Sequence, residues 1–261
     1  MLRYPNINPE ILRVGPFAVR WYGIMYLIGF ASSYLLVQYQ LKKSGSWNRV
    51  DIDSLYSYLI LGLLAGARLG YVVFYNLSFY LSHPLELFAV WHGGMSFHGG
   101  LIGSIVAGYL FCKKTKLNFW HTADLIVITA PIGLGLGRLG NFINGELYGR
   151  VTDVPWAMVF PSGGPAPRHP SQIYEFFLEG VVLFVVLWML RRKHYKPGIL
   201  TALFLVLYGA FRFFSEFFRE PDEQLGYVLG MFTMGQLLSL SMLLAGLIML
   251  YLRKRAESRL R

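Results

Sequence analysis

Three arginines lie inside stretches that are otherwise apolar. They are Arg68 in GARLGYVVF, Arg138 in GLGRLGNFING and Arg212 in YGAFRFFSEFFRE. A charged side chain near the centre of a bilayer costs at least about 2.5 kcal/mol, so such residues usually face a partner or a watery cavity. These three positions are therefore the first candidates for a buried polar site.

Four polar residues share one face of the helix expected around Arg212. Tyr208, Arg212, Glu216 and Arg219 fall within an arc of about 80° at helical spacing, and Pro221 is expected to end the helix after them. One interpretation is an internal ion pair between Arg212 and Glu216, four residues apart. The other is an anion site, which the second arginine beside a paired one favours.

His98 lies in WHGGMSFHGG, between glycines that allow a ligand to approach the backbone closely. A histidine titrates near neutral pH and can therefore act as a base; a capping or hydrogen-bonding role is the alternative. His92 and His169 show no zinc-binding spacing, so no metal site is predicted. Gly135, Gly137 and Gly140 match G-x-G-x-x-G, but at the end of a membrane helix they indicate close packing rather than a nucleotide site.

The elements that must position these residues are apolar helices. Apolar residues make up 55% of the 261 positions and charged residues 15%, against roughly 25% charged in soluble domains. The hydropathy pattern predicts an all-α polytopic membrane protein with about seven transmembrane helices in one domain, 1–261. The predicted spans are residues 17–41, 53–75, 95–111, 123–138, 174–190, 199–214 and 231–252.

Two further segments and the charge pattern complete this topology. Residues 77–90 are apolar but broken at His83-Pro84, which predicts an interfacial or re-entrant segment, and the Gly- and Pro-rich loop 139–171 is expected to form a lid-like insertion. Short basic clusters follow alternate spans, so the N-terminus is expected outside and the C-terminus in the cytoplasm. The same bias accounts for the net charge of +10 without nucleic acid, and Cys112, the single cysteine, is interpreted as a packing residue.

A continuous motif resembles the signature of bacterial prolipoprotein diacylglyceryl transferases. The pattern G-R-x-G-N-F-x-N-x-E-x-x-G is filled from Gly137 to Gly149, and further blocks match in the family's order: RWYGIMYLIGF, GARLGYVVFYN, GGMSFHGGLIG, RHPSQIYE and YGAFRFFSEFFREPD. Together these blocks span nearly the whole chain. The loop before RHPSQ looks shorter than in some members.

The resemblance implies transfer of a diacylglyceryl group from phosphatidylglycerol to the lipobox cysteine thiol of a preprolipoprotein. A thioether forms and glycerol phosphate leaves, in the bacterial plasma (inner) membrane and without a cofactor. It implies that Arg138 and Asn141 contact the headgroup and that Glu146 and Gly149 shape its pocket. Further cavity residues would be Tyr22, Arg68, Tyr208, Arg212, Glu216 and Arg219.

The family chemistry suits the residues singled out first. Arginine forks bind phosphate and can stabilise the negative charge that grows on the leaving group. The attacking thiol must lose a proton, for which His98 is the first candidate and Tyr208 the second. Two alternatives are an anion transporter or channel, which no internal repeat supports, and another membrane lipid-modifying transferase.

Overall fold

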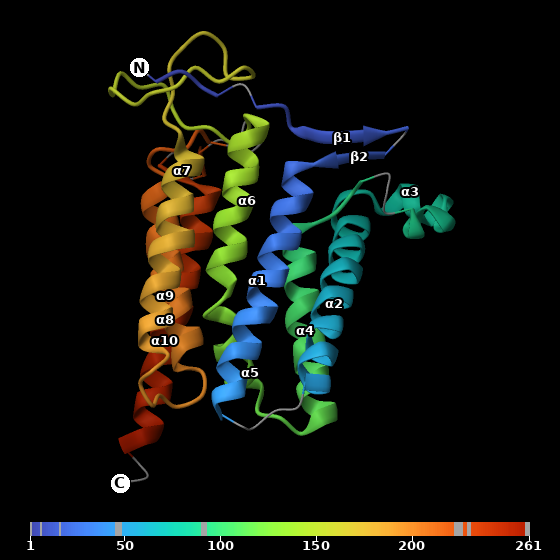
Figure 1. The fold of residues 1–261 in the computed structure, drawn as a ribbon, viewed down its shortest axis with the longest axis vertical. Helices are drawn as coiled ribbons and strands as arrows, with labels where there is room; N and C mark the ends of the chain where they lie inside the picture. Colours follow the sequence, from blue (N-terminus) through green and yellow to red (C-terminus); the bar gives the residue numbers. More distant parts are fainter. Residues whose placement is uncertain are drawn as a thin grey trace. The chain divides into compact units, whose positions relative to one another are not determined.

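The fold is taken from a computed structural model that describes residues 2–5, 7–15, 17–44, 49–89, 93–221, 227–228 and 231–258. Contacts divide the chain into two units, Met1–Leu36 with Asp124–Arg261 and Val37–Ala123. Each unit is mostly helical (Figure 1), and each is described by itself.

The first unit begins with a β-hairpin that the hydropathy pattern does not predict. Strands β1 (Glu10–Val14) and β2 (Phe17–Arg20) pair antiparallel, and helix α1 (Trp21–Ser44) follows directly. Gly15 adopts a left-handed φ of 59° in the connecting turn, a conformation that costs glycine little. The expected start of the first span at residue 17 is therefore wrong, because residues 17–20 pair with a strand.

The span expected at 123–138 is two helices that meet at a bend of 41°. Helix α5 (Phe119–Val127) ends before Thr129, and α6 (Ala130–Asn144) has Pro131 in its first turn. Proline lacks an N–H and cannot continue a helix across this point. Helix α6 then runs past Arg138 to a left-handed cap at Gly145, so the loop expected from residue 139 begins later.

One continuous helical run follows the loop. It consists of α7 (Ser171–Glu175), the π-helical turn η3 (Phe176–Val182) and α8 (Leu183–Leu190). This run packs closely on α6: the two backbones approach so closely that a Cβ added to Gly135 would lie 2.9 Å from the Cα of Gly180. π-Helical turns are rare and occur mostly at functional sites.

In the first unit, helix α9 (Ile199–Ser215) packs against this run, and α10 (Met234–Ser258) packs against α9 (Figure 1). A second short hairpin, β3 (Tyr227–Val228) and β4 (Phe232–Thr233), precedes α10. A buried apolar cluster joins α8, α9 and the turn after α5; its members are Leu183, Leu187, Leu200 and Ile128. Burial of such side chains is the main favourable term that holds these elements together.

The second unit is a pair of long helices with a short appendage. Helices α2 (Arg49–Tyr75) and α4 (Phe97–Thr115) approach through glycines; a Cβ on Gly70 would lie 2.7 Å from the Cα of Gly99. Small residues at such a seam let backbones meet, as is common in membrane helices. The break expected at His83-Pro84 is present, between α3 (Leu77–Ser82) and the 3₁₀ turn η1 (Pro84–Phe88).

In the described part of the chain, four helices are long and apolar enough to cross a membrane, and the bent pair α5 and α6 would make a fifth. Helix α9 is a shorter apolar helix. The chain is thus a mostly helical protein with the apolar helices of a multi-pass membrane protein.

A buried cluster of arginines and glutamates as the candidate functional site

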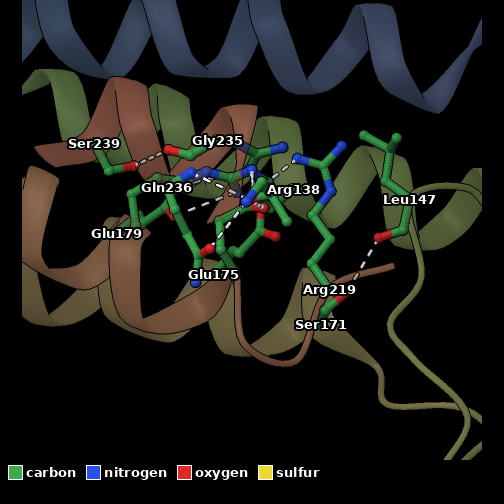
Figure 2. Close-up of polar contacts among 12 residues, drawn as sticks. Arg138, Leu147, Ser171, Glu175, Glu179, Arg219, Gly235, Gln236 and Ser239 are labelled. Carbon is green, nitrogen blue, oxygen red and sulfur yellow. Dashed lines mark hydrogen bonds and ion pairs between the residues drawn. The ribbon is translucent and has the colours of Figure 1, made fainter. Parts of the chain in front are cut away.

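The centre of the first unit holds an ion-pair cluster built by three elements. Arg138 comes from α6, Glu175 from α7 and Arg212 from α9. Glu175 Oε2 lies 2.6 Å from Nε of Arg138 and 2.8 Å from Nη1 of Arg212. One carboxylate therefore contacts both guanidinium groups, and Figure 2 shows the Glu175 and Arg138 side chains pointing toward one another.

A second carboxylate, that of Glu179 in η3, lies one turn further along the same helix. Its oxygens are 3.7 Å from Nε of Arg138 and 3.7 Å from Nη1 of Arg212. Glu175 and Glu179 are 1% and 0% exposed. Burying ions is costly unless they are paired, so the acids and the arginines depend on one another for their burial.

The sequence interpretation missed Glu175 and Glu179. The signal that could have found them is the pair of acidic residues four apart in an otherwise apolar run, YEFFLEG. Both would face the same side of a membrane helix, and the rule that singled out the arginines applies equally to acids.

Arg212 is also paired with Glu216, as one of the two sequence interpretations expected. Glu216 contacts Nη2 of Arg212 and lies 3.3 Å from Nη1 of Arg219. The helix expected to carry the four polar residues from Tyr208 to Arg219 on one face ends earlier, at Ser215. Arg219 lies in the following turn, and its side chain still reaches back to the cluster (Figure 2).

The helix ends early because the next residues pair with the loop after α6. Arg150 N–H donates to the Phe218 carbonyl at 2.9 Å, and Gly149 forms an antiparallel bridge with Arg219. A Cβ on Gly149 would clash with the Phe218 carbonyl and lie 2.6 Å from the Cβ of His169. This crowding accounts for glycine at 149.

The carboxylate of Glu216 is held from its other side by the start of α10. Thr233 Oγ1 donates to Glu216 Oε2 at 2.8 Å and accepts from Gln236 N–H at 3.1 Å, while Gln236 Oε1 accepts from Thr233 N–H. This reciprocal pattern is a capping box. A Cβ on Gly235 would lie 2.5 Å from the Glu216 carboxyl carbon. Only glycine at this position leaves room for the carboxylate beside the N-terminus of α10, where a negative charge is stabilised.

Glu146 and Asn141 form a second polar group beyond the end of α6. Glu146 Oε1 accepts from Nδ2 of Asn141 at 2.9 Å and from Nδ2 of Asn144 at 3.0 Å. Gln172 Nε2 donates to the Glu146 carbonyl at 2.6 Å and thereby ties this turn to α7. Asn141 is buried, whereas Glu146 is exposed.

The two tyrosines predicted for the site are both in the first unit and half-buried. Tyr22 packs its ring on Gly140, where an added Cβ would lie 2.9 Å from Cδ2, and its hydroxyl is 3.1 Å from that of Tyr26. Tyr208 lies on α9 one turn before Arg212 and stacks on Phe204 with ring centroids 5.6 Å apart.

His98 and Arg68 belong to the second unit. His98 is exposed in the first turn of α4, with its ring edge-on to Phe97. Arg68 is buried and donates to the backbone carbonyls of Glu86, Leu87, Ala89, Gly93 and Gly94. These contacts give Arg68 a structural task, which is to hold η1 and the residues that follow it; its part in substrate binding stays a prediction.

His169 is the histidine of the loop, and partial burial lowers its pKa below the ordinary value. Its Nδ1 lies 3.0 Å from the Tyr174 hydroxyl, which also accepts from Trp156 Nε1 at 2.7 Å. Within the described parts of the chain no group of three His, Cys, Asp or Glu side chains could hold a metal ion. His92 lies outside those parts.

A family model described as prolipoprotein diacylglyceryl transferase matches residues 9–252. The chain is similar to proteins named phosphatidylglycerol–prolipoprotein diacylglyceryl transferase. It is 54% identical over 262 residues to one from Desulfotalea psychrophila, covering 98% of this chain and 96% of that relative. One from Geobacter sulfurreducens is 53% identical over 257 residues (98% and 99% covered), and one from Bordetella avium 53% over 262 residues (99% of each). The resemblance of the sequence motifs is thereby confirmed, and the chain belongs to the prolipoprotein diacylglyceryl transferase family.

Proposed function

We propose that this chain transfers the diacylglyceryl group of phosphatidylglycerol to the lipobox cysteine of a preprolipoprotein. The relatives' names give the two substrates. The observation that carries the proposal is the arginine pair of the first unit, Arg138 and Arg212, which one buried carboxylate contacts at 2.6 and 2.8 Å. Such a pair suits an anionic phosphodiester, because each guanidinium offers several donors in a fixed plane.

The two arginines would act on the phosphate. The substrate sulfur forms a bond to the glyceryl carbon, and the electron pair of the breaking C–O bond leaves with the phosphate oxygen. Negative charge therefore grows on the phosphate in the transition state. Preorganised cations in a poorly hydrated site stabilise that charge without having to reorganise. Among the described residues the ion pairs of Arg138 run through Nε, which would leave its two Nη groups to bind the phosphate.

The thiol proton needs an acceptor, and His98 is the proposed base, with Tyr208 as the second candidate. His98 is exposed and lies in the first turn of α4, beside glycines. The variant His98→Gln should bind phosphatidylglycerol but form no thioether. Normal thioether formation by this variant would direct attention to Tyr208→Phe.

The remaining predicted residues would shape the headgroup pocket. The hydrogen bonds from Asn141 to Glu146 and the crowding at Gly149 give this part of the chain a fixed form that suits a pocket wall. Other proposed wall residues are Tyr22, Arg68, Glu216 and Arg219. No cofactor is needed for the displacement, since both reacting bonds belong to the substrates.

We further propose a seven-pass topology in the bacterial plasma (inner) membrane. Helices lie at each of the seven predicted places, and basic clusters follow alternate ones. This puts the N-terminus outside, the C-terminus in the cytoplasm and the arginine cluster toward the outer side. The whole chain would act as one catalytic domain, with the Gly- and Pro-rich loop as a lid-like insertion.

One assay tests the reaction. Purified protein is mixed with phosphatidylglycerol and a lipobox peptide, and the peptide is weighed by mass spectrometry. Addition of a diacylglyceryl mass supports the proposal. Addition of a single acyl group would instead identify an acyltransferase, and anion flux across liposomes without lipid turnover would identify a transporter.

A further inference from the structure

Glu179 is the acid of the cluster that makes no close contact with the arginines, so it does little to fix their orientation. It is 0% exposed, and neither carboxylate oxygen has a hydrogen-bond donor among the described residues. Each lies 3.7 Å from a guanidinium nitrogen. Glu175, one turn earlier, contacts the same two arginines at 2.6 and 2.8 Å and can fix their positions by itself.

Several charged groups lie around Glu179. Arg138 faces it from α6, Arg212 from α9 and Glu175 from its own helix. Glu216 contacts Arg212, and the Tyr208 phenol interacts electrostatically with Glu179 and with both arginines. In this surrounding a second acid opposes any anion that the two arginines bind, because like charges repel strongly where water is scarce.

The proposed reaction gives this opposing charge a purpose. The donor phosphate is a diester with one negative charge. When the glyceryl C–O bond breaks, the departing glycerol phosphate is a monoester, and its second ionisation lies near pH 6. At neutral pH the product is therefore more negative than the substrate, and a purely cationic site would hold the product more tightly.

We propose that Glu179 is a counter-charge residue that weakens the hold of Arg138 and Arg212 on phosphate and thereby favours release of glycerol phosphate. It acts through the two arginines and through the field at the site, without touching the reacting atoms. This inference rests on the proposed function, because that function supplies the phosphomonoester product.

The test compares Glu179→Gln with the wild type in two measurements. Binding of glycerol phosphate to the purified protein is measured by calorimetry, which needs no turnover, and KM for phosphatidylglycerol comes from the transfer assay. Removing one negative charge should lower the Kd of glycerol phosphate on the order of tenfold. The KM should fall less, about threefold, because the diester carries less charge. A purely structural role would not produce this difference between the two anions.

Two further variants complete the design. Glu175→Gln makes the same change of charge on the same helix but removes the acid in close contact with both arginines, so KM should rise and turnover should fall. Glu179→Asp keeps the charge but moves it away from the arginines by the length of one methylene. It should therefore tighten glycerol phosphate binding by less than Glu179→Gln. It also provides the measurement if Glu179→Gln does not insert.

The outcomes separate the inference from the proposed function. Unchanged or weaker binding of glycerol phosphate in the Glu179 variants would overturn the inference, as would equal tightening in Glu175→Gln. If the wild type transfers no diacylglyceryl group, the proposed function fails, whatever the binding measurements give.

Discussion

Among single residues, Arg138 and Arg212 are the proposed ligands of the phosphate. Their side chains are 20% and 10% exposed, and carboxylates from η3, α7 and the end of α9 surround them. A buried guanidinium with such partners is held in one orientation. This matters because bidentate recognition of phosphate depends on the plane of the fork as well as on its charge.

Replacing Arg138 by lysine tests that orientation. Arg138→Lys keeps the positive charge but loses the planar fork. We expect diacylglyceryl transfer to fall about a hundredfold, the range found when a preorganised donor is removed, with normal membrane insertion. The rate is measured with phosphatidylglycerol and a lipobox peptide. Arg192→Lys, at an exposed arginine after α8, is the control and should transfer normally; wild-type turnover in Arg138→Lys would refute the phosphate-binding role.

At the scale of elements, the N-terminus of α10 holds the carboxylate of Glu216, which contacts the arginines of the cluster. Thr233 caps this helix and also donates to Glu216, which in turn contacts Arg212 and Arg219. One hydroxyl thus links the helix N-terminus to two guanidiniums. The stability of α10 and the geometry of the arginines should therefore change together.

The variant Thr233→Val keeps the side-chain shape and removes the hydroxyl. Losing the cap should cost about 1 kcal/mol of stability, and transfer should slow because Glu216 loses a donor. Thermal unfolding in detergent and the transfer rate are the measurements. Thr233→Ser restores the hydroxyl and should recover most of both losses. A Val variant equal to the wild type would mean that the cap does not support Glu216.

The loop between α6 and α7 should respond to acid through His169. Burial lowers the pKa of His169, so the folded loop binds its proton less readily than the unfolded chain does. The contribution of this histidine to loop stability is therefore complete above about pH 6.5 and is lost as the pH falls toward the lowered pKa.

Limited proteolysis at pH values from about 7.5 to 5 checks this. Cleavage within the loop should rise as the pH falls, measured with a protease whose own activity is corrected at each pH. His169→Gln can still hydrogen-bond Tyr174 but does not titrate in this range, so it should flatten the response. An equally steep response in this variant would place the titrating group elsewhere.

At the scale of the whole molecule, the proposed topology makes a prediction about accessibility. Cys112 is buried, so a Cys112→Ala background allows single cysteines to be introduced. A membrane-impermeant thiol reagent should label Pro165→Cys, in the loop before α7, in intact cells or spheroplasts. It should label Lys193→Cys, between α8 and α9, only after permeabilisation. The opposite pattern would reverse the proposed orientation.

The sequence by itself indicated a mostly helical membrane protein and singled out Arg138 and Arg212, which the structure brings into one ion-pair cluster. Apolar runs of about 20 residues and arginines within them are local properties of the chain, and the signature from Gly137 to Gly149 was enough to indicate the family. The pairing of Arg212 with Glu216 also follows from helical spacing alone.

Only the tertiary structure decided which charges meet. Glu175 joins Arg138 of α6 to Arg212 of α9 because three helices pack at one place, and no spacing along the chain encodes that contact. The end of α9 at Ser215 depends on backbone pairing of Phe218 and Arg219 with residues 149–150, far away in sequence. The spacing of apolar residues indicates which residues are shielded from water. Ion pairs and strand bridges depend instead on partners that are distant in the sequence and that meet only in the folded chain.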